Sequence, residues 1–405
     1  MSGLERWIAR QRDHAAAMML KSISPVTIIK QRPHFSQVIA PKPGSVVASP
    51  VLAAYDPEPD YFFHWYRDSA LVMDALFLLR GELAEADRLF QDYVRFSLDV
   101  GALDGRALPP DWRAAARPDY ARFLRADVDR AHGMAIGTET RVNPDGTLDI
   151  TDWPRPQNDG SALRALCLLR WGAEGDAAKL LRRDLAFVLR HARGPGFDIW
   201  EEEKGLHAYT LRVSAAALEK GAEWLGARGE TVMAGHCHAE ARRLETMLDD
   251  FWMASQGWVL SRKAEGGAPE KQLDMSVILG ANHAGVQGAR YQQTLTRLEG
   301  LFDAAYAINH DRPNTRAPAL GRYLGDRYYS GGAYYFTTLA AAEFHYRIKD
   351  RAGGDAFLET VRAFTPESGD LSEQFDQHTG IQTSARHLAW SYAAFLTAVA
   401  ARDQP

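Results

Sequence analysis

Apolar residues recur at intervals of three and four along most of the chain, which is the period of an amphipathic helix. Segments in which apolar and polar residues alternate strictly, as strands require, are scarce. The pattern predicts twelve helices. Their ranges are 4–23, 68–81, 83–98, 160–173, 176–192, 207–228, 231–252, 275–285, 289–308, 333–350, 354–364 and 384–402.

The predicted helices alternate between two compositions. The third carries one apolar stripe, formed by Leu83, Ala86, Leu89, Phe90 and Tyr93, with charges on the opposite face, and the fifth and seventh are similar. The fourth, sixth, tenth and twelfth are rich in Ala, Ser and Thr and poor in charge, which is typical of buried helices. An outer and an inner ring of six helices each make an all-α (α/α)₆ barrel. We expect a single domain over the whole chain, with an insertion at about 100–150 that has a short helix of its own.

Aromatic and charged residues concentrate in the loops that enter the inner helices. Short connections make successive helices antiparallel, so all inner helices run the same way and these six entries meet at one end. The loops that enter outer helices, such as GAEGD and NHAGVQG, are short and plain. We therefore expect a binding site where the entries meet. The entries are YFFHWYRDSA (61–70), DWPRPQNDG (152–160), DIWEEEKGLHAY (198–209), KQLDMS (271–276), GRYLGDRYYSGGAYYF (321–336) and SEQFDQHTGIQTSAR (372–386).

The composition is that of a globular protein with a large core, because 46% of the 405 residues are apolar and 24% are charged. A net charge of −5 gives no reason to expect a nucleic-acid partner. No segment approaches the ~20 apolar residues of a membrane span. The apolar run AAAMML near the N-terminus is shorter and more closely flanked by charge than that of a signal peptide. We expect a cytoplasmic protein without a membrane partner, and the sequence leaves its oligomeric state open.

Paired carboxylates are the chemical groups that remain after other sites are excluded. The chain has no Gly-rich phosphate loop, no metal-ligand spacing and no nucleophile elbow, so we expect neither a cofactor nor a metal ion. Cys167 and Cys237 lie within helical patterns, which do not indicate a disulfide framework. Aromatic rings stack on the C–H faces of sugars, and Asp, Glu and Arg bond sugar hydroxyls in pairs. Paired carboxylates among such residues indicate glycoside hydrolysis.

Five segments within the entries carry a family resemblance: WYRDSALV, WPRPQNDGSALRAL, IWEE…G…HAYTL, GRYLGDRYY and SEQFD…SARHLAWSYAAFLTA. In this order they resemble the glucoamylase-type (family 15) glycoside hydrolases, in the bacterial-like form that consists of the catalytic domain only. The resemblance extends from about residue 4 to residue 402. It implies the (α/α)₆ barrel and an inverting, exo-acting α-glucosidase. Such an enzyme releases β-D-glucose from the non-reducing end of soluble α-1,4- or α-1,6-linked gluco-oligosaccharides.

The resemblance also implies a role for individual residues. Glu201 is expected to be the general acid and Glu373 the general base, while Trp153 supports the acid. Glu202 and Arg322 are expected to reach the second sugar. The residues expected to bind the terminal glucose are Tyr61, Trp65, Arg67, Asp68, Trp200 and Trp390, and Asp326 and Tyr328 match weaker positions.

The run of Glu201, Glu202 and Glu203 also suits an ordinary helix start, because acidic residues favour the positive end of the helix dipole. Five similar entries favour the catalytic interpretation of Glu201. Its apolar neighbour Trp200 and the like charge of Glu202 both favour a protonated carboxyl, as a general acid requires. An inverting pair needs roughly 6.5–9.5 Å between its carboxyls, and we expect this spacing between Glu201 and Glu373. Glu203 is expected to be a solvated surface charge.

Three alternatives stay open: a trehalase of the same family, a non-catalytic regulatory barrel like that of phosphorylase kinase, and a sugar epimerase on a similar toroid. Retention of both Glu201 and Glu373 argues against the second, and an epimerase would favour histidines. Linkage is open, because Tyr334 lies in SGGAYYF where fungal relatives carry an Asn-Pro-Trp segment. No Ser/Thr-rich linker or starch-binding module follows the barrel, which favours soluble, imported oligosaccharides over raw starch.

Overall fold

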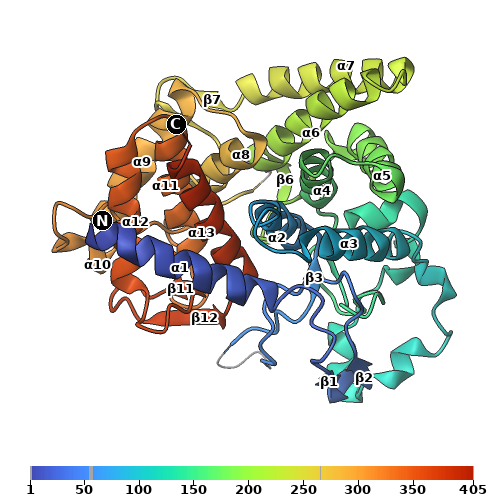
Figure 1. Cartoon of the computed structure of the whole chain (residues 1–405). Helices are drawn as coiled ribbons and strands as arrows, with labels where there is room; N and C mark the ends of the chain where they lie inside the picture. Colours follow the sequence, from blue (N-terminus) through green and yellow to red (C-terminus); the bar gives the residue numbers. More distant parts are fainter. Residues whose placement is uncertain (1, 54–57, 265, 405) are drawn as a thin grey trace.

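Six inner helices form a closed ring in the computed structural model, which describes residues 2–53, 58–264 and 266–404 (Figure 1). Each inner helix packs against the next in the chain, and the last packs against the first. The ring consists of α2 (Tyr66–Phe77), α4 (Asp159–Arg170), α6 (Ala208–Gly226), α8 (Ser276–Ala284), α11 (Tyr335–Arg347) and α13 (Ala389–Arg402).

A second set of helices covers this ring. The outer helices are α1 (Gly3–Leu20), α3 (Ala86–Val100), α5 (Gly175–His191), α7 (Thr231–Asp249), α9 (Ala289–Ala305) and α12 (Arg351–Phe364). Burial follows the predicted division: 11 of the 13 residues of α11 are buried, but only 4 of the 17 residues of α9. The N-terminal α1 packs against the C-terminal α13 and so completes the outer layer. The predicted all-α (α/α)₆ barrel is confirmed.

Most predicted helix bounds lie within three residues of the observed ones, and two of the differences have a cause in the tertiary structure. The segment expected as one helix over 289–308 divides at Tyr306, whose backbone is extended, and the short α10 (Ala307–His310) follows. The Tyr306 hydroxyl donates to the carbonyl of Gly331 at 2.9 Å, which ties this break to a neighbouring loop. The helix expected from residue 384 begins at Ala389, because the residues before it form strand β12 (Gln382–Arg386).

Short antiparallel strands lie at the entries to the inner helices. One sheet has the order β10 (Ala333–Tyr334), β11 (Ser372–Phe375) and β12, and another the order β5 (Gly196–Phe197), β6 (Lys204–His207) and β9 (Arg262–Lys263). A third pairs β3 (His64–Trp65) with β4 (Arg141–Val142). Two further pairs are β1 (Lys30–Arg32) with β2 (Gln37–Ile39) and β7 (Trp252–Met253) with β8 (Trp258–Val259). Strands of two to five residues are too short to show alternation, so the sequence did not predict them.

The insertion contains no α-helix over 101–158, all of which the structure describes, and its short helices are of the 3₁₀ type. Prolines at 109, 110 and 118 remove helical N–H donors, and the chain forms isolated 3₁₀ turns instead. These are η2 (Gly105–Ala107), η3 (Trp112–Ala115), η4 (Pro118–Phe123), η5 (Val128–Arg130) and η6 (Gly133–Thr138). Strand β4 of the insertion pairs with β3, immediately before α2. The insertion therefore supports one entry of the barrel.

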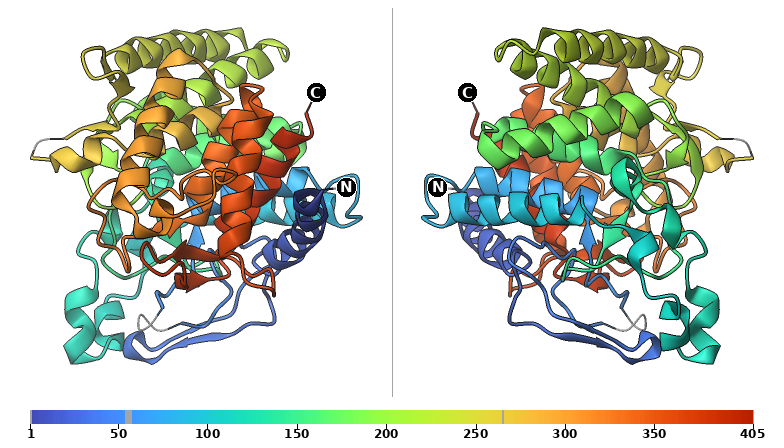
Figure 2. Two further views of the ribbon diagram at one scale, coloured as in Figure 1. Left: turned by 90° about the vertical axis from the view of Figure 1, so that its left-hand side faces the viewer. Right: turned by 90° about the vertical axis from the view of Figure 1, so that its right-hand side faces the viewer.

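The entries gather at one end of the barrel, as predicted. Figure 2 shows the N-terminal loops and the C-terminal β11–β12 hairpin on the same side of the helices. Backbone bonds join them, because the N–H of Ala389 donates to the carbonyl of Ala48 at 2.8 Å. None of the helices in the described ranges has both the length and the apolar composition that a bilayer crossing requires.

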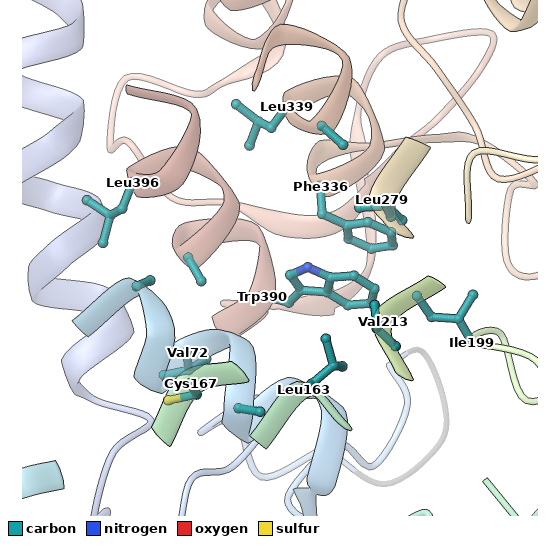
Figure 3. Packing of buried hydrophobic residues seen from close by; sticks show 14 of the residues in the cluster. Val72, Leu163, Cys167, Ile199, Val213, Leu279, Phe336, Leu339, Trp390 and Leu396 are labelled. Carbon is teal, nitrogen blue, oxygen red and sulfur yellow. The ribbon is translucent and has the colours of Figure 1, made fainter. Parts of the chain in front are cut away.

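An aromatic pair occupies the centre of the barrel core. The rings of Phe336 and Trp390 stack with their centroids 4.2 Å apart and an interplanar angle of 6°. Figure 3 shows this pair between α11 and α13, with Leu163 and Leu279 from two other inner helices nearby. Both rings belong to the first turns of their helices, so they lie just below the end where the entries meet.

Candidate active site

A cavity between the entries contains both predicted catalytic carboxylates. Glu201 and Glu373 line it together, although they are far apart in the sequence. The other lining residues are Ala48, Tyr61, Trp65, Arg67, Asp68, Ile199, Trp200, Arg322, Phe336, Leu388 and Trp390. Of the predicted site residues, Trp153, Glu202, Asp326 and Tyr328 do not line this cavity but contact residues that do.

The barrel also has a larger hollow at its other end, beyond Phe336 and Trp390. Its walls are mainly the middle and C-terminal parts of the inner helices. Neither Glu201 nor Glu373 lines this hollow, so the candidate site is identified by its chemistry and not by size.

Glu201 has a strained backbone. It follows Trp200 in the connection between β5 and β6, and its φ of 66° lies in the left-handed region. This conformation costs roughly 1–3 kcal/mol for a residue other than glycine. Asp198 holds the turn, because its carbonyl accepts from the N–H of Glu201 at 3.0 Å and its carboxylate accepts from that of Glu202 at 2.9 Å. The surrounding structure thus fixes the direction in which the Glu201 side chain leaves the turn.

Three N–H donors hold the Glu201 carboxylate. Its Oε1 accepts from Trp65 Nε1 at 2.8 Å and from the guanidinium of Arg67 at 3.0 Å. Its Oε2 accepts from Trp153 Nε1. The contact with Trp153 agrees with the supporting role expected for that residue.

The polar groups of Trp200 and Glu202, the neighbours of Glu201 in the sequence, have partners of their own. The Glu202 carboxylate is directed towards cations, since it accepts from Arg322 at 2.9 Å and pairs with Lys271. The indole N–H of Trp200 donates to Asp274 at 2.8 Å. The Glu202 carboxylate and the Trp200 indole N–H thus bond other residues, while the Glu201 carboxylate accepts from Trp65, Arg67 and Trp153.

Arg67 and Asp68 form a buried ion pair at the start of α2, with 3.1 Å between nitrogen and oxygen. Arg67 also donates to the carbonyl of Ile199 at 2.8 Å, and its guanidinium carbon lies 5.4 Å from the ring centroid of Trp390. Burial raises the pKa of Asp68, while the charge of Arg67 opposes the rise. A carboxylate and a guanidinium side by side offer both acceptors and donors to the hydroxyls of a sugar.

Glu373 lies on β11, the middle strand of its sheet, and is 8% exposed. Burial raises the pKa of Glu373 to about 7. The hydroxyls of Ser384 and Tyr61 donate to its two oxygens, the latter at 3.3 Å, and both bonds oppose the rise. A carboxyl with a pKa near neutrality is well matched to accept a proton from water.

Two aromatic side chains connect the two carboxyls. The Tyr61 ring, whose hydroxyl bonds Glu373, lies with its centroid 5.2 Å from that of Trp65, whose N–H bonds Glu201. Tyr328 supports this chain, because its hydroxyl lies 2.8 Å from that of Tyr61. Both carboxyls therefore face the same cavity, and the rings of Tyr61 and Trp65 form the part of its wall that connects them.

Arg322 is the centre of a second polar cluster. Asp326 accepts two hydrogen bonds from it, each at 2.6 Å, and Tyr334 donates to Asp326 at 2.9 Å. Tyr334 is completely buried, with its ring centroid 5.2 Å from the guanidinium carbon of Arg322, so it supports this cluster and does not form a wall of the cavity.

Glu203 was expected to be a solvated charge, and this prediction is wrong. Its Oε2 lies 2.8 Å from Arg262 Nε, and its Oε1 lies 3.5 Å from Lys271 Nζ. The side chain is 21% exposed. Glu203 therefore belongs to a row of alternating charges that begins at Arg322 and continues through Glu202 and Lys271.

The polar residues of the site that were not predicted include Ser384, Lys271, Tyr323 and Asp274. Tyr323 donates to Glu202 at 2.6 Å, and the other three bond Glu373, Glu202 and Trp200 respectively. All four lie within the entry segments, so their position gave a signal. Their partners depend on how the hairpins pair, which composition does not show.

Comparison with known proteins gives matches to glycoside hydrolases over most of the chain. The family model described as glycosyl hydrolases family 15 matches residues 31–98, 134–353 and 349–400, and passes over most of the insertion. Glucoamylase 1 of Rhizopus oryzae is 25% identical over 98% of this chain and 71% of its own length. The intracellular sporulation-specific glucoamylase of Saccharomyces cerevisiae is 23% identical over 100% of this chain and 85% of its own. The structure of Hormoconis resinae glucoamylase has a TM-score of 0.80 at 26% identity, and covers 99% of this chain and 74% of that one.

The (α/α)₆ barrel and the matches to glucoamylases define the class of protein, which is a glycoside hydrolase. Because the family model matches well over half of its residues, the chain belongs to family 15 of the glycosyl hydrolases.

Proposed function

We propose that this protein is an inverting, exo-acting α-glucosidase of the glucoamylase type, which removes the terminal glucose of α-1,4- or α-1,6-linked gluco-oligosaccharides. The observation that carries the proposal is that Glu201 and Glu373 line one cavity together with Arg67 and Asp68. The stacked rings of Phe336 and Trp390 close the inner end of this cavity, so an oligosaccharide would enter it with its terminal sugar first. The product is β-D-glucose.

In this proposal Glu201 is the general acid and Glu373 the general base. Glu201 gives its proton to the glycosidic oxygen as the bond between that oxygen and C1 breaks. Glu373 takes a proton from a water molecule that attacks C1 from the opposite face, so the configuration at C1 inverts. A carboxyl separation of roughly 6.5–9.5 Å leaves room for this water and stays a prediction.

The remaining residues bind and orient the substrate. Arg67 and Asp68 bond hydroxyls of the terminal glucose, and Tyr61, Trp65, Trp200 and Trp390 enclose its ring. Glu202 and Arg322 reach the second sugar, because they form an ion pair at 2.9 Å beside Trp200, whose ring centroid lies 5.3 Å from the Arg322 guanidinium carbon. Lys271, which is 14% exposed, pairs with Glu202 there. Trp153 holds Glu201, while Tyr328 and Asp326 support Tyr61 and Arg322.

We further propose one catalytic domain over 1–405, acting in the cytoplasm. The insertion shares a hydrophobic cluster with the barrel, in which Val128 packs with Tyr66 and Phe96. Residues 3–20 form the first outer helix and bury Trp7 and Ile8, which supports a structural role for this segment over an export signal. One relative is itself named as intracellular.

The function is tested by a panel of maltose, maltotriose, isomaltose, panose and trehalose, with glucose release as the readout. We expect glucose from the α-1,4- or α-1,6-linked members and little from trehalose. Cleavage of trehalose alone would instead identify a trehalase, and no cleavage of any member would identify a non-catalytic barrel.

Ser384→Ala should move the acidic limb of the pH–activity profile to higher pH. Glu373 must be ionised to act as a base, and its pKa of about 7 makes activity fall as the pH drops below neutrality. The Ser384 hydroxyl stabilises the ionised carboxylate, so its removal raises the pKa further. The measurement is kcat/KM against pH.

The matched control for this profile is Ser391→Ala. Ser391 is equally buried, but its hydroxyl donates at 2.8 Å to the carbonyl of Ser372 and not to Glu373. The acidic limb of the Ser391→Ala profile should coincide with that of the unmodified protein. An acidic limb that stays in place or moves to lower pH in Ser384→Ala would contradict the role of this hydroxyl.

A further inference from the structure

Asp274 connects three parts of the site although it does not line the cavity. It is 2% exposed and lies two residues before α8. Its Oδ1 accepts from the N–H of Ser276 at 2.6 Å, and its Oδ2 accepts from Trp200 Nε1 at 2.8 Å. Its backbone bridges to Tyr323, and the next residue, Met275, donates to the carbonyl of Arg322 at 2.9 Å. The segment at Asp274 thus joins the first turn of α8 to the loops of Glu201 and Arg322.

Trp200 is the link between Asp274 and the cavity. Its ring lines the cavity, lies 6.0 Å from that of Phe336 and is 5.3 Å from the guanidinium carbon of Arg322. Its N–H bonds Asp274, which lies outside that cavity. A buried indole N–H without an acceptor loses free energy, so this bond specifies the orientation of the ring.

Trp200 immediately precedes Glu201, the residue with the strained backbone. Glu201 follows directly, with its φ of 66°, and a strained conformation persists only where its surroundings hold it. Asp198 fixes the turn by two hydrogen bonds: its carbonyl accepts from the N–H of Glu201, and its carboxylate accepts from the N–H of Glu202. Asp274 is the residue that fixes the side chain immediately before Glu201.

We propose that Asp274 is a positioning residue for the general acid: by anchoring the indole of Trp200 it holds the Glu201 carboxyl at the glycosidic oxygen. The inference rests on the proposed role of Glu201. Asp274 acts through Trp200 and contacts neither the sugar nor the reacting atoms. Its loss therefore impairs protonation of the leaving group and leaves the attack by water intact.

The test compares two substrates that differ in their need for an acid. Maltose requires protonation of its leaving oxygen, whereas the fluoride of α-D-glucosyl fluoride departs without a proton from Glu201. In Asp274→Ala we expect kcat on maltose to fall about 100-fold, the lower end of the range for a general acid, with KM changed less than about threefold. On the fluoride, kcat should stay within about threefold of the unmodified protein. Asp274→Asn, which keeps an oxygen for the indole N–H, should recover part of the loss on maltose.

Two further variants separate positioning from a general loss of structure. Trp200→Phe removes the indole N–H, and adding Asp274→Ala to it should cause little further loss if both act through one bond. Asp184→Asn is the matched control, because Asp184 is as buried and accepts from Arg164 at 2.6 and 2.8 Å, but lies between α4 and α5 away from the site. In Asp184→Asn the ratio of kcat on maltose to kcat on the fluoride should equal that of the unmodified protein.

An equal loss on both substrates in Asp274→Ala, or no loss on either, would overturn the inference. Glu201→Gln separates this outcome from failure of the proposed function. If Glu201→Gln loses activity on maltose and keeps it on the fluoride while Asp274→Ala does not, the role of Asp274 alone is refuted. If Glu201→Gln keeps normal activity on maltose, the proposed role of Glu201 is refuted and the inference fails with it.

Discussion

Glu201→Gln is expected to lower kcat on maltose by about 1,000-fold, within the range of roughly 10²–10⁴ that a general acid contributes. Glutamine has the shape of glutamate, and its carbonyl oxygen still accepts from Trp65 and Arg67 at the Oε1 position. It has no acidic proton to give to the glycosidic oxygen. The loss should therefore appear in kcat, with a thermal unfolding midpoint close to that of the unmodified protein.

The adjacent glutamates provide controls for this result. Glu202→Gln should mainly raise KM, because Glu202 bonds Arg322, the residue proposed to bind the second sugar with it. Glu203→Gln should change kcat by less than about fivefold, since its partners are Arg262 and Lys271 and it does not line the cavity. Near-normal turnover in Glu201→Gln, or an equal loss in Glu203→Gln, would contradict the assignment of the acid.

Glu373→Ala is expected to lower kcat by a similar factor, about 1,000-fold, because it removes the carboxylate proposed to take the proton from the attacking water. The truncation also leaves space where the carboxylate stood, beside Ser384 and Tyr61. A small anionic nucleophile such as azide needs no base and should attack C1 of α-D-glucosyl fluoride in that space. The expected product is β-D-glucosyl azide, detected by NMR.

The control for azide rescue is Glu201→Gln, in which the base is intact and azide should give no comparable gain. Asp376→Asn is a second control, because Asp376 bonds the N–H groups of His378 and Thr379 in the turn after β11 and lies outside the cavity. Formation of the α-azide from Glu373→Ala would contradict inversion. Full activity of Glu373→Ala without azide would contradict the role of Glu373 as base.

The helices and their layers could be predicted from the sequence because they depend on local composition. Burial of the Ala- and Thr-rich α11 and exposure of α9 follow directly from their residues. Two of the bounds that differ from the prediction have tertiary causes. The chain before α13 pairs with β11, and the break at Tyr306 is tied to Gly331 by a hydrogen bond.

The cavity could be predicted, but its hydrogen bonds could not. The similar composition of the six entries, together with the family resemblance, predicted Glu201 and Glu373 at one end of the barrel. In the structure both line one cavity. The direction of the Glu202 side chain depends on its ion pairs with Lys271 and Arg322, which belong to two other loops. The partners of Ser384 and Asp274 likewise follow from hairpin pairing, which short strands do not reveal in a sequence.

The measurement that most directly tests the pairing of Glu201 and Glu373 is the anomeric form of the first glucose released from maltose, followed by ¹H NMR before mutarotation. An acid and a base on opposite faces of C1 predict that the β-anomer appears first and the α-anomer grows in later. If the α-anomer appeared first, the two carboxyls would work by retention, and the water-separated pair proposed for this cavity would be wrong.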